Sequence, residues 1–255
     1  IILVEHKDNQ KIRKIFNKVN KYARQTSRGD NIITSDDDIY AVIARKLFSD
    51  GEVLAPIGKC ELVNWKSNTL SQRSKQLTTV SALYTIAETI LKEKGYSSKL
   101  LPSQEEQEVS YEEIVEFWRE LLAETDVYKE YLELTKADKP VSLLREQNLL
   151  MKPVTQMALA HVAALAKKKG VSWKEVVAKL NKVDWSFENK LWFNILIIGS
   201  AQKKMITGKE SIKSAGMIIS YLIMGDKMSK TEIGDVHKII RDAHDNQEEP
   251  LPKMV

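Results

Sequence analysis

Basic side chains without acidic neighbours dominate residues 11–28, which contain seven Lys or Arg and no Asp or Glu. If residues 11–24 form a helix, side chains three and four positions apart share a face. One face then carries Lys11, Lys14, Lys18 and Lys21, and another carries Arg13, Asn17, Asn20 and Arg24. A surface helix usually intersperses Glu with its Lys, so this segment repels itself unless an anion is bound to it.

Two hydroxyl side chains and an arginine follow the basic helix, at Thr26, Ser27 and Arg28. Guanidinium, ammonium and hydroxyl groups are the donors that phosphate oxygens accept. The pattern therefore predicts contact with a ligand that carries phosphates. A solvated basic face, with Asn side chains capping the helix end, accounts for the same composition and stays open as the alternative.

A second cluster of similar chemistry lies between residues 64 and 74. It consists of Asn64, Lys66, Ser67, Asn68, Arg73 and Ser74. Residues 70–94 have the pattern of a long helix that Gly95 closes, so the cluster would precede a helix N-terminus, where backbone N–H groups favour an anion. The alternative is a simple N-cap and turn, with Asn68 as the cap and Ser71 in the first turn.

The elements that must position these clusters are mostly helices. The apolar residues 1–6 indicate a short buried strand, and apolar spacing in residues 9–23 predicts an amphipathic helix. Ser35 with the acids after it predicts the N-cap of a helix over residues 36–48. Ser followed by Glu three residues later predicts helix starts near residues 111, 173 and 230. Further helices are expected over residues 153–169, 187–199 and 209–224.

Composition limits the class of protein. The chain has 255 residues, 43% of them hydrophobic, which suits one large or two small domains. No apolar run approaches the ~18 residues of a membrane span. The single cysteine, Cys60, excludes an intrachain disulfide and predicts a reducing cytoplasm. With one thiol and four scattered histidines, no metal site is expected.

Three stretches resemble segments of one protein family. "IFNKVNKYARQTSRGDNIITSDDDIYAVIARKL" is similar to the segment that follows the Asp-Gly-Gln-His-Arg signature of DGQHR-domain proteins. Their best-known members are the DndB proteins of bacterial DNA sulfur modification (phosphorothioation). "NWKSNTLSQRSKQLTTVSALY" and "LLREQNLLMKPVTQMALAHV" resemble two later segments, the last through Arg145, Pro153 and Gln156. The likeness extends over most of residues 1–225.

The family signature itself does not occur in these residues. In the family it lies just before a strand like "IILVEH", so we expect a segment upstream of Ile1. The family resembles the ParB/sulfiredoxin superfamily, in which two boxes face a nucleotide phosphate. Asn20 and Arg24 are the closest counterpart of the second box, with Val19 in place of its acid. The resemblance suggests ATP as a cofactor, and binding of ATP would therefore need the upstream segment.

The resemblance and the pattern together predict a mainly α protein with a small α/β element at its N-terminus. Residues 1–69 would be the remainder of a ParB-like DGQHR domain, and residues 70–255 a helical domain. The resemblance implies a cytoplasmic DNA-binding regulator or accessory protein of DNA sulfur modification or a related defence system, one that represses transcription of the modification operon. DNA is the expected partner, and other DNA-modification proteins or a second copy are further candidates.

The resemblance also assigns site residues. From the first segment these are Asn17, Asn20, Arg24, Thr26, Ser27 and Arg28, and from the second they are the cluster between residues 64 and 74. Two other classes of function stay open. One is a nucleotide hydrolase or DNA nickase that the upstream signature completes. The other is a module that only builds an oligomer or holds a partner protein.

Overall fold

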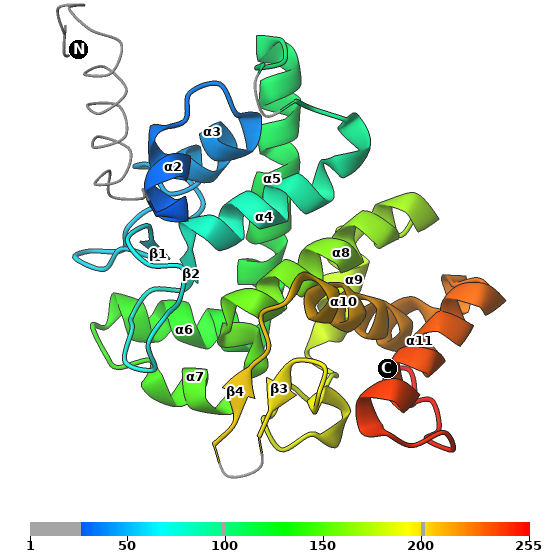
Figure 1. Ribbon diagram of the computed structural model, residues 1–255. Helices are drawn as coiled ribbons and strands as arrows, with labels where there is room; N and C mark the ends of the chain where they lie inside the picture. Colours follow the sequence, from blue (N-terminus) through cyan, green and yellow to red (C-terminus); the bar gives the residue numbers. More distant parts are fainter. Residues whose placement is uncertain (1–26, 98–99, 200–201) are drawn as a thin grey trace, which may run out of the picture.

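The computed structural model describes residues 27–97, 100–199 and 202–255. Most of these residues lie in helices, and two short two-stranded sheets accompany them (Figure 1). The prediction of a mainly α protein with little strand is therefore confirmed. The strand predicted over residues 1–6 and the helix predicted over residues 9–23 lie outside the described residues.

Two short helices and a parallel pair of strands come first. Helix α2 spans Arg28–Thr34 and α3 spans Ile39–Lys46, while β1 (Val63–Asn64) pairs in parallel with β2 (Thr78–Thr79). The N-cap of α3 is Asp38, whose carboxylate accepts from the Tyr40 N–H at 2.9 Å. The prediction that Ser35 caps this helix was wrong, because the Ser35 side chain donates to Asp37 instead.

Helix α4 begins later than its sequence pattern predicts. It spans Val80–Ile90 with Thr79 as its N-cap, and the 3-10 helix η1 (Lys92–Lys94) and the left-handed Gly95 follow it. Gly95 closes the region as predicted, whereas residues 70–77 form a loop rather than the first turns of a helix. Side chains from distant parts of the chain hold that loop, as described below.

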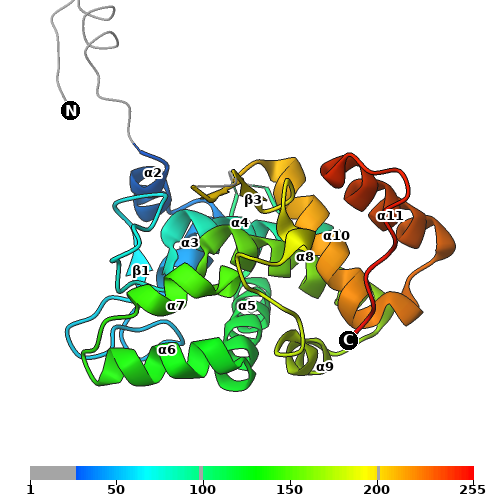
Figure 2. The same ribbon diagram turned by 90° about the horizontal axis from the view of Figure 1, so that it is seen from below.

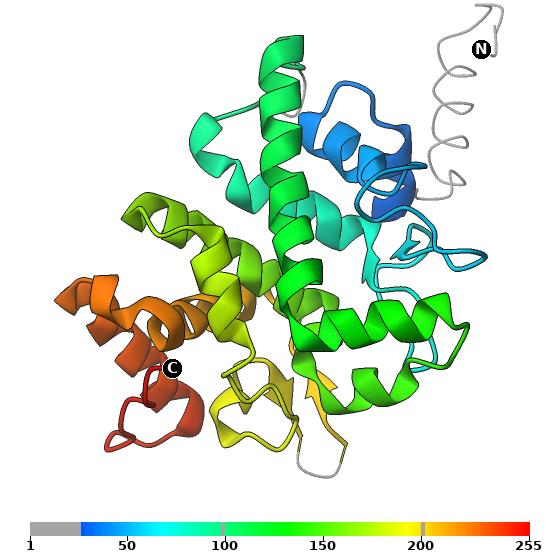
Figure 3. The same cartoon turned by 180° about the vertical axis from the view of Figure 1, so that it is seen from behind.

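A long helix runs along the rear of the molecule, and shorter helices surround it (Figure 3). The helices of this region are α5 (Gln104–Glu124), α6 (Asp126–Lys136), α7 (Ser142–Gln147), η2 (Leu149–Met151), α8 (Pro153–Lys169) and α9 (Trp173–Leu180). The start predicted near residue 111 was wrong, because Ser103 and Glu106 form the capping box. Ser110 fits the same pattern but is buried inside α5. The starts at Pro153 and Trp173 are confirmed.

The last third of the chain contains two long helices and a small hairpin. Its elements are η3 (Lys190–Trp192), β3 (Ile197–Ile198), β4 (Lys204–Met205), α10 (Lys209–Met224), η4 (Gly225–Lys227) and α11 (Lys230–His244). The prediction of a helix over residues 187–199 was wrong, because Asn194 and Gly199 have positive φ angles of 55° and 95°. The helices predicted over residues 209–224 and from residue 230 are confirmed.

Helix α8 lies at the centre of the core, between α4 and α10. Gly216 of α10 allows the close approach, since a Cβ there would lie 2.7 Å from Cβ of His161. One cluster of buried apolar residues extends from Ile32 to Ile240. Helices α2 and α3 lie at the opposite end of the molecule from α11 (Figures 1 and 2). None of the described helices combines the length and apolarity that a membrane span needs.

Candidate nucleic-acid interface

The described end of the first cluster, Ser27 and Arg28, meets the second cluster where α2 packs on the loop after β1. Gly29 is buried in the first turn of α2, and a Cβ on it would overlap the backbone oxygen of Trp65. Ser27 caps α2 through a capping box with Asp30. The absence of a side chain at Gly29 therefore brings Ser27 and Arg28 beside the loop that carries Asn64 to Asn68.

Helix α4 connects the two clusters. The Arg28 Nη2 donates to Oγ1 of Thr85 at 2.9 Å, and the Ser81 hydroxyl donates to Oδ1 of Asn68. Ser81 and Thr85 are one turn apart on α4, and the Thr85 hydroxyl donates to the Ser81 carbonyl at 3.0 Å. Arg28 and Asn68, far apart in the sequence, are thus attached to the same face of one helix.

Arg28 also contacts an aromatic ring. Its guanidinium carbon lies 5.5 Å from the centroid of the Tyr84 ring, within the range of a cation–π contact. The Tyr84 hydroxyl donates to Oδ2 of Asp38 at 2.7 Å. Burial, and then this hydrogen bond, raise the pKa of Tyr84, so the phenol stays neutral and remains a donor. The arginine itself stays exposed.

Several of the predicted side chains shape the loop. Oδ1 of Asn64 accepts from the N–H groups of Lys66 and Ser67 at 3.0 and 3.1 Å, which is an Asx turn. The Ser67 hydroxyl accepts from the Thr69 N–H at 3.2 Å. The cluster does form a turn, as the alternative predicted, and Asn64 holds that turn. The prediction that Asn68 caps the next helix was wrong, because Thr79 is the N-cap of α4. These contacts order the backbone that presents Lys66.

Three positive charges on α2 and on the loop after β1 lack an acidic partner among the described residues. Arg28, Lys66 and Arg73 are exposed, and none of them forms an ion pair with Asp or Glu among the described residues. The ammonium of Lys66 lies 5.0 Å from the centroid of the Trp65 ring. By contrast, Lys75, at the end of the same loop, pairs with Asp138 at 2.6 Å. The uncompensated charge that the sequence predicts therefore extends to this loop.

Ser74 has a structural role that the sequence did not reveal. Its hydroxyl donates to Oε1 of Gln76 at 2.9 Å, and its carbonyl accepts from Nε of Arg145 at 3.0 Å. Arg145 is 1% exposed and also donates to the carbonyls of Gln76 and Met151. Ser74 thus fixes the C-terminal end of the loop, away from the Asn64–Asn68 turn.

Neighbouring side chains complete this attachment. The Tyr131 hydroxyl donates to the Lys75 carbonyl at 2.8 Å, and Nε2 of Gln156 lies 3.3 Å from the Leu77 carbonyl. Burial lowers the pKa of Arg145, which has carbonyl acceptors but no carboxylate partner among the described residues. Arg145 and Gln156, which the resemblance singles out, therefore hold the loop in place rather than reach a ligand.

Two further polar residues on α4 belong to the site and were missed. Ser81 and Thr85 are spaced by four, so they share one face of a helix whose first two turns are mainly apolar, and this spacing is the signal that could have found them. The remaining predicted residues, Lys14, Asn17, Lys18, Asn20, Lys21, Arg24 and Thr26, lie outside the described part of the chain. Within that part, no group of three His, Cys, Asp or Glu is placed to hold a metal ion.

Together these features define a class of protein: a helical protein with a basic loop surface, rich in hydroxyl and amide groups, where α2, α4 and the loop after β1 meet. A family model described as DndB, DNA-sulfur modification-associated, matches residues 1–223. The chain therefore belongs to the DndB family, and the resemblance of its segments is confirmed. No curated protein and no solved structure matches the chain. The ParB-like element, the upstream signature and the domain boundary after residue 69 stay predictions.

Proposed function

We propose that this protein binds DNA in the cytoplasm as a regulator or accessory protein of a DNA sulfur modification system. Membership of the DndB family supports the link to DNA sulfur modification. The observation that carries DNA binding is a set of three exposed cations on α2 and the loop after β1, Arg28, Lys66 and Arg73, none of which pairs with an acid in the described part of the chain.

The proposed contacts are to the DNA backbone. Arg and Lys side chains on loops neutralise phosphates, and amide and hydroxyl groups donate to phosphate oxygens. Arg28 has a fixed direction because Thr85 and the Tyr84 ring hold its guanidinium from one side. The basic residues 11–24 precede this surface in the chain and would extend the same interface. Contacts of this kind fix position on a duplex without reading its sequence.

A triple variant tests the proposal. Replacing Arg28, Lys66 and Arg73 by Ala should weaken binding to a duplex by about tenfold or more, since each lost contact is worth roughly 0.5–1 kcal/mol. The loss should be similar on unrelated duplex sequences. The matched control replaces Lys174, Lys182 and Lys238, exposed lysines near α9 and α11, and removes the same charge. Equal losses in both variants would show that only net charge matters and would contradict the proposed interface.

Two other outcomes separate the alternative functions. Phosphate release from ATP that an Arg24→Ala variant abolishes would indicate a nucleotide hydrolase. If neither salt nor these substitutions change the affinity for DNA, the remaining alternative is a module that builds an oligomer or holds a partner protein. A repressor acts by staying bound to DNA. If this protein is a repressor, cells that carry the triple variant should no longer repress the modification operon.

A further inference from the structure

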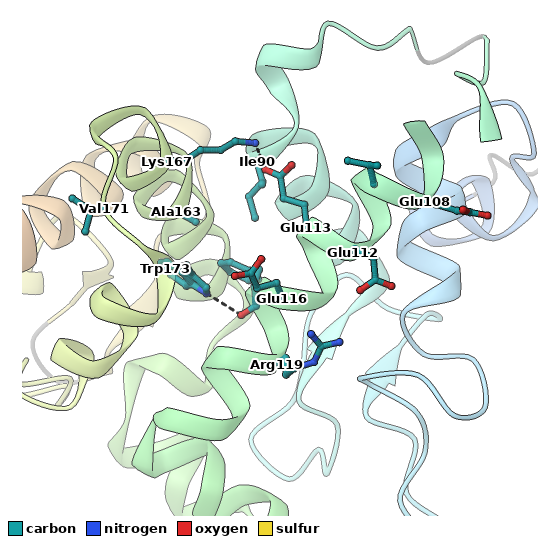
Figure 4. Close-up of a pocket in the computed structure, with 12 residues that line it drawn as sticks. Ile90, Glu108, Glu112, Glu113, Glu116, Arg119, Ala163, Lys167, Val171 and Trp173 are labelled. Atoms are coloured by element: carbon teal, nitrogen blue, oxygen red, sulfur yellow. Dashed lines mark hydrogen bonds and ion pairs between the residues drawn. The ribbon is translucent and has the colours of Figure 1, made fainter. Parts of the chain in front are cut away.

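A groove on the rear face of the molecule has an apolar floor and an acidic rim. Helices α5, α8 and α9 and the end of α4 line it, and its volume is about 700 Å³ (Figure 4). Ile90, Ala163 and Val171 contribute aliphatic surface. It is separate from the basic loop surface, because no residue of α2 or of the loop after β1 lines it.

The floor is rigid. The rings of Phe117 and Trp173 stack with their centroids 5.0 Å apart and 14° between their planes. The indole N–H of Trp173 donates to the carbonyl of Phe117 at 3.1 Å, which fixes the ring to α5. Val109, at the margin, is 57% exposed. Phe117 is buried, so the accessible apolar surface comes from Trp173, which is partly exposed, and from Val109. Partly exposed apolar side chains of this kind are typical of a site that receives another apolar side chain.

The rim is mainly acidic: three of its carboxylates form no ion pair among the described residues, although Arg119 and Lys167 also belong to the lining. Glu108, Glu112 and Glu116 are spaced by four along α5, so they form one stripe beside the floor. None of the three forms an ion pair with Lys or Arg in the described ranges, whereas Glu113 pairs with Lys167 at 2.5 Å (Figure 4). Like charges four apart destabilise an isolated helix, so this stripe favours a cationic ligand.

We propose that this groove docks residues 11–24 of the chain itself as an amphipathic basic segment. Lys14, Lys18 and Lys21 repeat at spacings of four and three, which suits the carboxylate stripe of the rim. Ile12, Ile15, Phe16 and Val19 form the apolar stripe of the same segment and suit the floor. Both the charge and the apolar surface of the groove thus have a counterpart in this segment.

Docking has a consequence for regulation that rests on the proposed function. The same lysines cannot neutralise DNA phosphates and the groove carboxylates at once. The groove would therefore compete with DNA for residues 11–24 and lower the affinity of the protein for DNA. Docking itself does not require DNA binding, and it is measured below without DNA, so the two proposals fail independently.

The test uses the full chain and a fluorescent synthetic peptide of residues 9–26. Lys14, Lys18 and Lys21 of the protein are first replaced by Gln, so that its own segment leaves the groove free. Peptide binding, followed by fluorescence anisotropy at physiological salt, should weaken about tenfold or more when Glu112 and Glu116 are also replaced by Gln. The matched control replaces Glu130 and Glu133, two exposed glutamates of α6, and should bind the peptide as before.

Two peptide variants make the test specific. A peptide with Ile15→Ser and Phe16→Ser keeps all charges and should bind at least about tenfold more weakly, because it cannot fill the apolar floor. A peptide with Lys14→Glu and Lys18→Glu should regain binding to a protein with Glu112→Lys and Glu116→Lys, as a direct charge pair requires. The proposal would be overturned if the unmodified peptide bound equally well to the Glu112/Glu116 variant and to the Glu130/Glu133 control. It would also be overturned if the peptide with Ser at positions 15 and 16 bound as tightly as the unmodified peptide.

Discussion

Gly29 lies against the backbone carbonyl of Trp65, so helix α2 packs directly on the loop after β1. Because any larger residue would overlap that oxygen, this contact sets the position of Arg28 relative to Lys66. The geometry of the basic loop surface thus depends on a residue that carries no side chain and no charge.

Substitution of Gly29 by Ala should separate α2 from the loop. Because backbone atoms meet there, we expect the free energy of unfolding to fall by about 1–3 kcal/mol, together with DNA affinity. Gly234→Ala is the matched control: it lies inside α11 with nothing near its Cβ position, and should stabilise the protein by about 0.5–1 kcal/mol. Chemical denaturation measures both. Unchanged stability of the Gly29 variant would mean that α2 is free of the loop.

Arg145 should be essential for stability rather than for ligand contact. Replacing it by Met leaves the carbonyls of Ser74, Gln76 and Met151 without its donors, which should cost about 3 kcal/mol or more. Arg119→Met is the control, since Arg119 is exposed, and should change stability by less than about 0.5 kcal/mol. Hydrogen exchange should also speed up in residues 70–77. Slow exchange there in the Met variant would show that other contacts hold the loop.

Glu232 should make stability depend on acid pH. A hydrogen bond from Lys169, at 2.7 Å, and then the Ser229 capping contacts lower the pKa of Glu232 from 4.5 to about 2. A pKa depressed in the folded state means that the contribution is complete above about pH 4.5 and is lost as the pH falls toward 2. Denaturation of Glu232→Gln should therefore show a shallower acid slope than the wild type. Glu130→Gln is the control. If it reduces the acid slope of the stability–pH curve as much as Glu232→Gln does, Glu232 is not the source of that slope.

Local patterns predicted several elements well. Ser172 and Ser229 begin α9 and α11 as their sequences indicate, because a Ser with Glu three residues later satisfies the free N–H groups at a helix start. The same pattern failed at Ser110, since Ser103 with Glu106 forms an equivalent cap seven residues earlier. Only tertiary packing decides between them: Ser110 is buried and accepts from Lys94 at 2.9 Å.

The candidate site was only partly predictable for a related reason. Its two clusters could be found by composition, but their meeting depends on Ser81 and Thr85 of α4 and on the close approach at Gly29. The loop over residues 70–77 was predicted as helix, because its attachment comes from Arg145, far along the chain. Contacts between distant segments leave no local signal in a single sequence.

The salt dependence of DNA binding tests the central claim most directly. Each phosphate contact that releases counterions adds about 0.9 to the slope of log affinity against log salt concentration. The wild type should show a steep negative slope, and the variant lacking Arg28, Lys66 and Arg73 should lose about three units of it, while the control lacking Lys174, Lys182 and Lys238 keeps it. An identical slope in the wild type and in the first variant would contradict a DNA interface at this surface.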